Sequence, residues 1–210
     1  MTITIFGATG MVGKELILHC QAKGYIVRAF GRNVESIIDT DLRDDNFKAV
    51  KGSVFDAGDV LKAVMGSDAV LTALGGAYDG NDVTRSLGMK NIIAQMSKAG
   101  AKRIIGVGGV GVLNANENIL VMDTPGYPQQ YLPVGGEHLK AYEFLAASEL
   151  NWTFVCPPEI LPKPADGHFV TKADYPTGGS TINAGNLALF MVQEITNNQF
   201  VNQRVGISNN

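Results

Sequence analysis

The sequence predicts one α/β domain over residues 1–210, built around a doubly wound parallel sheet of about seven strands. Short apolar runs alternate with stretches of helical spacing along the whole chain, which is typical of repeated strand–helix–strand units. A length of 210 residues suits one domain, and many of the 25 glycines follow the apolar runs. Glycines at these positions predict tight turns close to a bound ligand.

The expected strands share short runs of β-branched and other apolar residues, most of which stop at a glycine or a proline. In chain order they are Thr2–Phe6, Tyr25–Phe30, Phe47–Lys51, Ala69–Leu74, Arg103–Val107, Thr153–Cys156 and Arg204–Ile207. We expect right-handed crossovers between the parallel strands.

The expected helices repeat apolar residues every three or four positions, as Val12, Leu16 and Cys20 do. Glycines mark the ends of the first and fourth helices, and Asp56 precedes the third as a candidate cap. In chain order the helices are Met11–Lys23, Val34–Ile38, Ala57–Met65, Asn81–Ala99, Gly135–Leu150 and Asn183–Thr196.

Two long irregular segments interrupt this alternation, at about 113–133 and 158–179. Irregular segments of this length are usually functional or mobile. They follow the fifth and sixth strands, so they belong to the carboxyl edge of the sheet, where ligands bind in doubly wound folds. We expect them to form the substrate site.

Composition excludes several classes of protein. A net charge of −3 without a basic stripe argues against nucleic acid as a partner. No apolar run approaches the roughly 18 residues of a membrane span. The start MTITIFGATG lacks the pattern of a secretory signal, so we expect a cytoplasmic protein. The two cysteines, Cys20 and Cys156, have no metal-binding or disulfide spacing, which predicts buried free thiols and no metal site.

The sharpest signal is the turn Gly7-Ala8-Thr9-Gly10-Met11-Val12-Gly13, which follows a strand and begins a helix. Gly7 permits a tight turn, Gly10 lets the main chain approach a pyrophosphate, and Gly13 lets the helix pack closely. The helix start then offers free amides and a partial positive charge to an anion. The pattern predicts a dinucleotide-binding Rossmann fold, the alternative being a glycine-rich turn without a ligand.

The end of the second strand indicates which dinucleotide binds. Where NAD-dependent enzymes usually carry an acid for the ribose 2′-hydroxyl, this chain has Arg32, which could bind a 2′-phosphate through two hydrogen bonds. This predicts NADP(H), with NAD(H) as an alternative and a solvated arginine as the other interpretation. Asp56 either caps the next helix or lies near the adenine. The pairs 75–76 and 108–109 should border the ribose and nicotinamide.

These motifs resemble the small NAD(P)H-binding branch of the atypical short-chain dehydrogenase/reductases, which includes proteins similar to biliverdin-IXβ/flavin reductase and NmrA-like proteins. The resemblance rests on GATGMVG, GRN at 31–33, GSVFD at 52–56 and HLKAYEFLAASELNWTFVCPP ending at Pro158. It implies the strand order 3-2-1-4-5-6-7 and a backbone around Pro157–Ile160 that faces the nicotinamide. The expected cofactor contacts are Gly7, Thr9, Gly10, Met11, Val12, Gly13, Arg32, Asn33, Asp56, Leu74, Gly75, Gly108, Pro157 and Ile160.

The usual proton donor of the larger superfamily is missing. None of the six tyrosines has a lysine four residues later, and the fifth strand ends in glycines where a serine is common. Carbonyl reduction by that mechanism is not expected, and an acceptor such as a flavin or quinone, which needs little acid catalysis from the protein, fits better.

Two residues are candidates for the proton donor. Glu159 stands where the flavin-reductase relatives have a histidine, and burial could raise its pKa; the alternative is a solvated glutamate. His138 is the second candidate, with a surface or capping role as its alternative. Lys140 could reach the ribose. Tyr127 and Tyr131 could stack on a planar substrate or pack within their loop.

The sequence therefore predicts an NADPH-dependent oxidoreductase that passes hydride to a flavin, quinone or similar planar acceptor. It acts as a monomer or homodimer on a small substrate. The alternative is a non-catalytic NADP(H)-sensing regulator of the NmrA-like type. A third class, epimerase-like chemistry on a nucleotide sugar, is weakened by the missing tyrosine–lysine pair.

Overall fold

The structure, a computed structural model, describes residues 1–37, 45–77, 79 and 81–210. Its strands are β1 (Thr2–Phe6), β2 (Ile26–Gly31), β3 (Phe47–Lys51), β4 (Ala69–Thr72), β5 (Arg103–Val107), β6 (Asn151–Cys156), β7 (Glu159–Leu161), β8 (Phe169–Ala173), β9 (Thr181–Asn183) and β10 (Gln203–Asn209). Its α-helices are α1 (Met11–Ala22), α2 (Ala57–Val64), α3 (Thr84–Ala99), α4 (Leu132–Ala146) and α5 (Ala184–Asn197). Short 3₁₀ helices are η1 (Val34–Ile37), η3 (Val110–Val112), η4 (Val121–Asp123) and η5 (Gln129–Tyr131).

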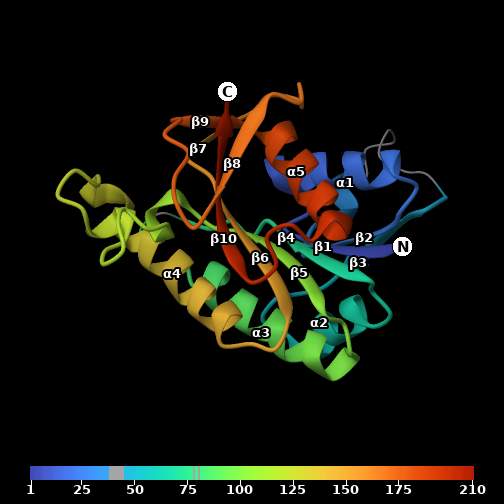
Figure 1. Cartoon of the computed structure of the whole chain (residues 1–210). Coiled ribbons are helices and arrows are strands. Elements are labelled where there is room, and N and C mark those ends of the chain that lie inside the picture. The colour runs from blue at the N-terminus through green and yellow to red at the C-terminus, as the bar shows by residue number, and fades with distance from the viewer. Residues whose placement is uncertain (38–44, 78, 80) are drawn as a thin grey trace.

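The main sheet of the described residues has eight strands in the order β3-β2-β1-β4-β5-β6-β10-β8 (Figure 1). All neighbours in it are parallel except β8, which runs antiparallel to β10. The expected order 3-2-1-4-5-6-7 is confirmed, because β10 is the seventh strand of the sequence-based assignment. The order in which successive strands are added reverses between β1 and β4, and a doubly wound fold binds its ligand at such a point.

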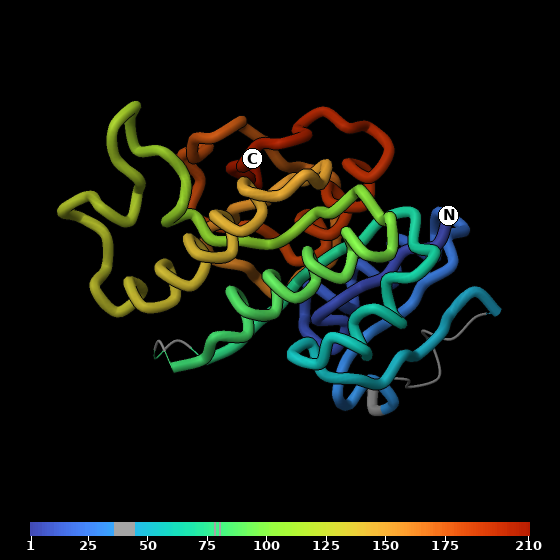
Figure 2. Tube along the Cα trace, turned by 90° about the horizontal axis from the view of Figure 1, so that it is seen from below, coloured from blue at the N-terminus to red at the C-terminus, as the bar shows by residue number. Residues whose placement is uncertain are grey.

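Helices cover both faces of the sheet. The helices α1 and α5 lie together on one face, and α2, α3 and α4 cover the other (Figures 1 and 2). Each face has its own apolar core: Ile5 and Leu16 belong to the first, and Phe154 and Ile92 to the second, all fully buried. Burial on both faces explains why the central strands read as continuous apolar runs.

The segment 158–179, expected to be irregular, contains two strands. β8 adds an antiparallel edge to the main sheet, with Ile207 of β10 opposite Thr171. β7 pairs in parallel with β9 in a separate two-stranded sheet. The segment 113–133 does lack strands apart from one isolated bridge, and it extends away from the sheet beside the start of α4 (Figure 2).

Several helix boundaries differ from expectation, and the largest difference is the end of α4, at Ala146 instead of Leu150. α4 begins at Leu132, three residues before the predicted Gly135, because Pro133 suits a first helical turn, where no amide is needed. α3 begins at Thr84 instead of Asn81. The predicted helix at Val34 is a 3₁₀ helix ending at Ile37, and Ile38 lies outside the described residues.

The expected buried free thiols are confirmed. Cys20 and Cys156 are both buried and unbridged. Among the described residues, none of the helices combines the length and apolar composition needed to cross a bilayer.

Candidate functional site

A cavity of about 1410 Å³ opens where the carboxyl ends of β1 to β6 meet. Its walls come from the turns after these strands, the start of α1, the start of α4 and the loop that precedes α4. Of the expected cofactor contacts, Gly7, Thr9, Gly10, Met11, Val12, Arg32, Leu74, Gly75, Gly108, Pro157 and Ile160 line the cavity, whereas Gly13, Asn33 and Asp56 do not. Its position and lining therefore agree with the predicted ligand site.

The glycine turn depends on close backbone approaches. Gly7 has a φ of +77°, and a Cβ there would lie 2.2 Å from the carbonyl oxygen of Ala73. A Cβ at Gly13 would lie 2.2 Å from the carbonyl oxygen of Gly7. Gly7 thus allows β1 and β4 to end side by side, and Gly13 allows α1 to begin directly against the turn.

The amino end of α1 is available to a ligand. Gly10 is its N-cap, no side chain caps the helix, and its first turn contains no acidic residue. Helix amides without a cap, together with the helix dipole, form a site for an anion. Because Gly10, Met11 and Val12 also line the cavity, this end of the pocket fits the pyrophosphate of a dinucleotide.

Arg32 lines the cavity near the glycine turn that precedes α1. It follows β2, is exposed, and has no hydrogen-bond or ion-pair partner among the described residues. Thr9 reaches the same corner, since its Cγ2 lies 3.6 Å from the Cβ position of Gly31. Asp56 instead caps α2 by accepting a hydrogen bond of 2.8 Å from the amide of Asp59, so the adenine interpretation of Asp56 has no support in this geometry.

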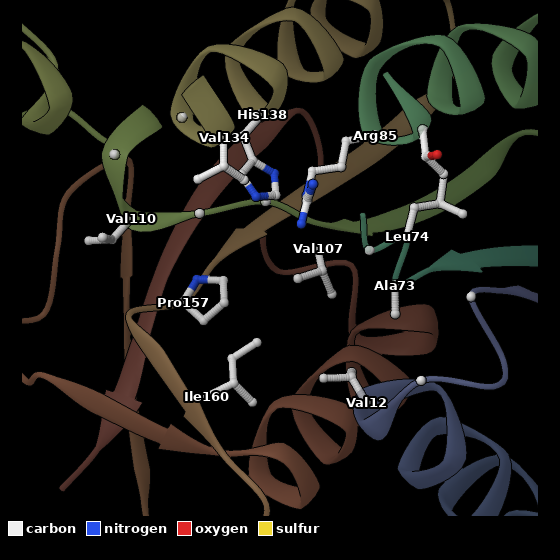
Figure 3. Close-up of a pocket in the computed structure, with 18 of the residues that line it drawn as sticks. Val12, Ala73, Leu74, Arg85, Val107, Val110, Val134, His138, Pro157 and Ile160 are labelled. Atoms are coloured by element: carbon white, nitrogen blue, oxygen red, sulfur yellow. The ribbon is translucent and has the colours of Figure 1, made fainter. Parts of the chain in front are cut away.

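Apolar side chains form much of the other end of the cavity. Figure 3 shows Val107, Val134, Pro157 and Ile160 around it, from four different segments of the chain. The expected loop residues Tyr127 and Tyr131 also line the cavity, together with Val110 and Val121. This end offers smooth walls and aromatic rings to a flat ligand.

Tyr127 sits in a space made by two glycines. Its hydroxyl lies 2.7 Å from the missing Cβ of Gly111 and 3.4 Å from that of Gly135. Burial, and secondarily the neighbouring Tyr131, raise the pKa of Tyr127. The ring is therefore a neutral part of the wall at pH 7, held between the 3₁₀ turn after β5 and the start of α4.

The His138 side chain lines the cavity from α4, so it neither caps the helix nor lies on the open surface. Within the described residues its Nδ1 is buried without a hydrogen-bond partner. Burial, followed by the nearby charge of Arg85, lowers the pKa of His138 to about 3, while Glu137 acts in the opposite direction. The imidazole is neutral at pH 7 and is a hydrogen-bonding group there, not an acid.

Sequence reasoning missed Arg85, which also lines the cavity. The residue is 7% exposed, and its guanidinium donates to the carbonyl oxygens of Gly76 (3.0 Å) and Ala77 (3.1 Å). The signal was its spacing: Arg85 shares the buried face of α3 with Met89 and Met96. An arginine on an apolar helix face usually has a specific reason to be buried.

The remaining candidates are arranged differently. Lys140 does not line the cavity; its Nζ binds the buried carboxylate of Glu137 at 2.9 Å. Ser86 donates to the same carboxylate. Burial raises the pKa of Glu137, but the hydrogen bonds from Ser86 and Lys140 outweigh it and leave the pKa below its usual value. Glu159 lies on β7 at the cavity edge and is exposed, which favours the solvated interpretation.

Comparisons with known proteins agree with this geometry. The model of a family described as NAD(P)H-binding matches residues 7–198. The chain is 30% identical over 162 residues to the uncharacterized protein YwnB of Bacillus subtilis, across 75% of this chain and 71% of YwnB. A putative epimerase from Bacteroides thetaiotaomicron superposes with a TM-score of 0.85 and 26% identity, over 99% of this chain and 96% of that one. A putative NADH-flavin reductase from Streptococcus pneumoniae has a TM-score of 0.81 and 23% identity over 100% of both chains, a likeness of fold alone.

Proposed function

This chain belongs to the NAD(P)H-binding family, and from that premise we propose that it is an NADPH-dependent oxidoreductase that passes hydride to a planar acceptor such as a flavin or a quinone. The observation that carries the proposal is one continuous cavity, which extends from the uncapped start of α1 to the apolar side chains around Pro157. A dinucleotide at one end and a flat acceptor at the other would share it. The solved structure of the same fold described as a putative NADH-flavin reductase supports this choice of acceptor.

The preference for NADPH rests on Arg32. Its guanidinium is exposed at the dinucleotide end of the cavity, and no acidic residue lies between Arg28 and Asn33 to bind a ribose 2′-hydroxyl instead. A planar guanidinium matches a phosphate with two parallel hydrogen bonds. The amides at the start of α1 would hold the pyrophosphate that both coenzymes share.

A bound nicotinamide coenzyme supplies hydride, so the protein needs mainly to bind, orient and shield the two reactants. Pro157 and Ile160 form an apolar surface beside the end of β5. Tyr127 and Tyr131 would cover the acceptor on the outer side and keep water away from it. Excluding water in this way strengthens every electrostatic contact inside the site.

The test is reduction of a panel of acceptors. Purified protein should oxidise NADPH when FMN, FAD or a soluble quinone is added, and should oxidise it only slowly with aldehydes or ketones. If no member of the panel is reduced while NADPH still binds tightly, the oxidoreductase function is refuted and the non-catalytic NADP(H)-sensing role takes its place.

Coenzyme choice is tested by Arg32→Ala. Hydrogen bonds to charged groups contribute about 1.5–3 kcal/mol, and because Arg32 is exposed we expect the lower end, so NADPH affinity should fall about tenfold. NADH affinity should change little. Lys51→Ala is the matched control, since Lys51 is also exposed and ends the strand that pairs with β2 beside Gly31. Fluorescence titration measures both affinities, and equal losses for NADPH and NADH would contradict the assignment.

A further inference from the structure

Two nitrogen-bearing side chains enter the cavity from different helices on the same side of Val107. His138 comes from α4 and Arg85 from α3, and their nitrogen atoms point toward a common part of the wall (Figure 3). Neither belongs to the dinucleotide end, which lies near Val12. The pair therefore faces the part of the cavity assigned to the acceptor.

The backbone fixes the position of Arg85. The carbonyl groups of Gly76 and Ala77 accept from its two terminal nitrogens. Asp82 fixes this loop in turn, because its carboxylate accepts from the amides of Ala77 (3.0 Å) and Thr84 (2.8 Å). A charge held this way needs no rearrangement when a ligand arrives, which is the condition for efficient electrostatic stabilisation.

A glycine makes room for His138. A Cβ at Gly109 would lie 3.0 Å from Cδ2 and 3.4 Å from Nε2 of the imidazole, closer than side chains normally approach. The ring consequently packs against bare backbone after β5. Its Nδ1 is buried without a partner among the described residues, so the hydrogen bonding of the ring is not used up within the protein.

The charges around the pair favour a bound anion. The guanidinium of Arg85 carries a permanent positive charge, and a neutral imidazole has one N–H donor. The neighbouring carboxylate, Glu137, is already bound by Ser86 and by Lys140 at 2.9 Å. The pair thus presents a net positive charge and a donor to the cavity.

We propose that His138 and Arg85 form an oxyanion site, in which the imidazole donates a hydrogen bond to a carbonyl oxygen of the acceptor and the guanidinium stabilises the negative charge that reduction leaves there. This inference rests on the proposed oxidoreductase function and narrows its substrate. The acceptor is a planar molecule whose reducible system is conjugated to a carbonyl group, a property that quinones and flavins share.

The step balances without a proton from the protein. The acceptor gains a hydride, that is one proton and two electrons, in a new C–H or N–H bond, and an electron pair of its conjugated system moves to the carbonyl oxygen. This hydride would come from the reduced nicotinamide of a bound coenzyme, which would be oxidised in exchange. The oxyanion takes up a proton from water afterwards. A neutral histidine suits this role because it donates a hydrogen bond without giving up its proton.

The direct test uses 4-nitrophenol, a planar probe whose phenolate and phenol forms differ in absorption. We expect the protein, with and without oxidised NADP, to bind the phenolate at least about tenfold more tightly than the phenol, which lowers the pKa of the bound probe by about one unit or more. Arg85→Met should remove most of this shift and His138→Phe part of it, whereas Arg85→Lys should restore some of it.

Arg28→Met is the control for losing a structural arginine. Arg28 also donates to two backbone carbonyls, those of Ala63 and Met65, but it does not line the cavity. The Arg28→Met variant should leave the pKa shift of the bound 4-nitrophenol unchanged. If Arg85→Met does not fold, Arg85→Lys and His138→Phe still decide the question.

The outcomes separate this inference from the proposed function. A probe that does not bind, that binds with an unchanged pKa, or whose shift survives in both His138→Phe and Arg85→Met overturns the oxyanion site. Reduction of quinones or flavins alongside such a result would leave the oxidoreductase function standing. If the pKa of the bound probe is shifted but no acceptor is reduced, the anion-binding pair stands and the oxidoreductase function is refuted. Where turnover occurs, kcat should fall about 10²-fold in either variant while the Kd for NADPH stays unchanged.

Discussion

The turn at Gly7 offers a measurement in which two costs can be separated. In Gly7→Ala the new side chain meets a φ of +77°, which costs about 1–2 kcal/mol in an L-residue. Its Cβ would also lie 2.2 Å from the carbonyl oxygen of Ala73, and forcing an atom into a packed site typically costs a further 1–3 kcal/mol or so. We expect Gly7→Ala to lower the free energy of unfolding by about 2–5 kcal/mol.

Gly24→Ala isolates the first cost. Gly24 has a φ of +71°, close to that of Gly7, but a Cβ there would meet nothing within 4 Å. The Gly24→Ala variant should lose only about 1–2 kcal/mol of its free energy of unfolding. Urea unfolding followed by circular dichroism measures both variants, and titration with NADPH at a temperature where both are folded measures binding. Gly7→Ala should bind weakly and Gly24→Ala normally. Equal losses of stability would refute the close approach of β1 and β4 as the reason for Gly7.

Three further predictions follow from the buried groups. Because the folded-state pKa of His138 lies near 3, the unfolded chain binds a proton first as the pH falls below about 6.5. Acidification from pH 7 to 5 should therefore lower the free energy of unfolding by about 2 kcal/mol more in the unmodified protein than in His138→Phe. The same dependence on pH in urea unfolding of both proteins would contradict this. Gly111→Ala would place a Cβ 2.7 Å from the hydroxyl of Tyr127, so it should raise the KM for the acceptor without changing NADPH affinity. Gly136→Ala, where the space is open, should do neither. Glu194→Ala removes the ion-pair partner of the buried guanidinium of Arg103, whose Nη2 lies 3.1 Å from Glu194 Oε1. The free energy of unfolding in chemical denaturation should fall by about 3–5 kcal/mol, and a loss below about 1 kcal/mol would count against the pair.

The parts of the fold that local patterns determine could be predicted from the sequence. The turn at 7–13 and the central strands were predicted because glycine spacing and apolar runs are local signals. β8 was missed because its sequence, FVTKA, does not alternate apolar and polar residues, and because its partner, β10, lies more than thirty residues away. β7 and β9 have only three residues each, too few to show a period.

The acceptor end of the site was less accessible to such reasoning. His138 was named, but its neutral state depends on burial by other segments of the chain and on the charge of Arg85 on another helix. Arg85 itself stands where a solvated residue is the ordinary expectation. Only its spacing from Met89 on α3 pointed to the buried face. The start of α4 at Leu132 was missed because Pro133 was counted as a loop residue instead of a helix start.

The position of α5 determines how the cavity can change its width. α5 packs against α1, which carries the dinucleotide end, and it continues directly from β9, which pairs with β7 at the acceptor wall. These two walls are thus attached to one packed unit, and separating them would break contacts between α1 and α5. Entry and exit of a substrate have to be accommodated by the opposite wall, where the loop before α4 carries Tyr127 and Tyr131. Substitutions inside α5 should therefore affect coenzyme and acceptor together, while changes in that loop should affect the acceptor alone.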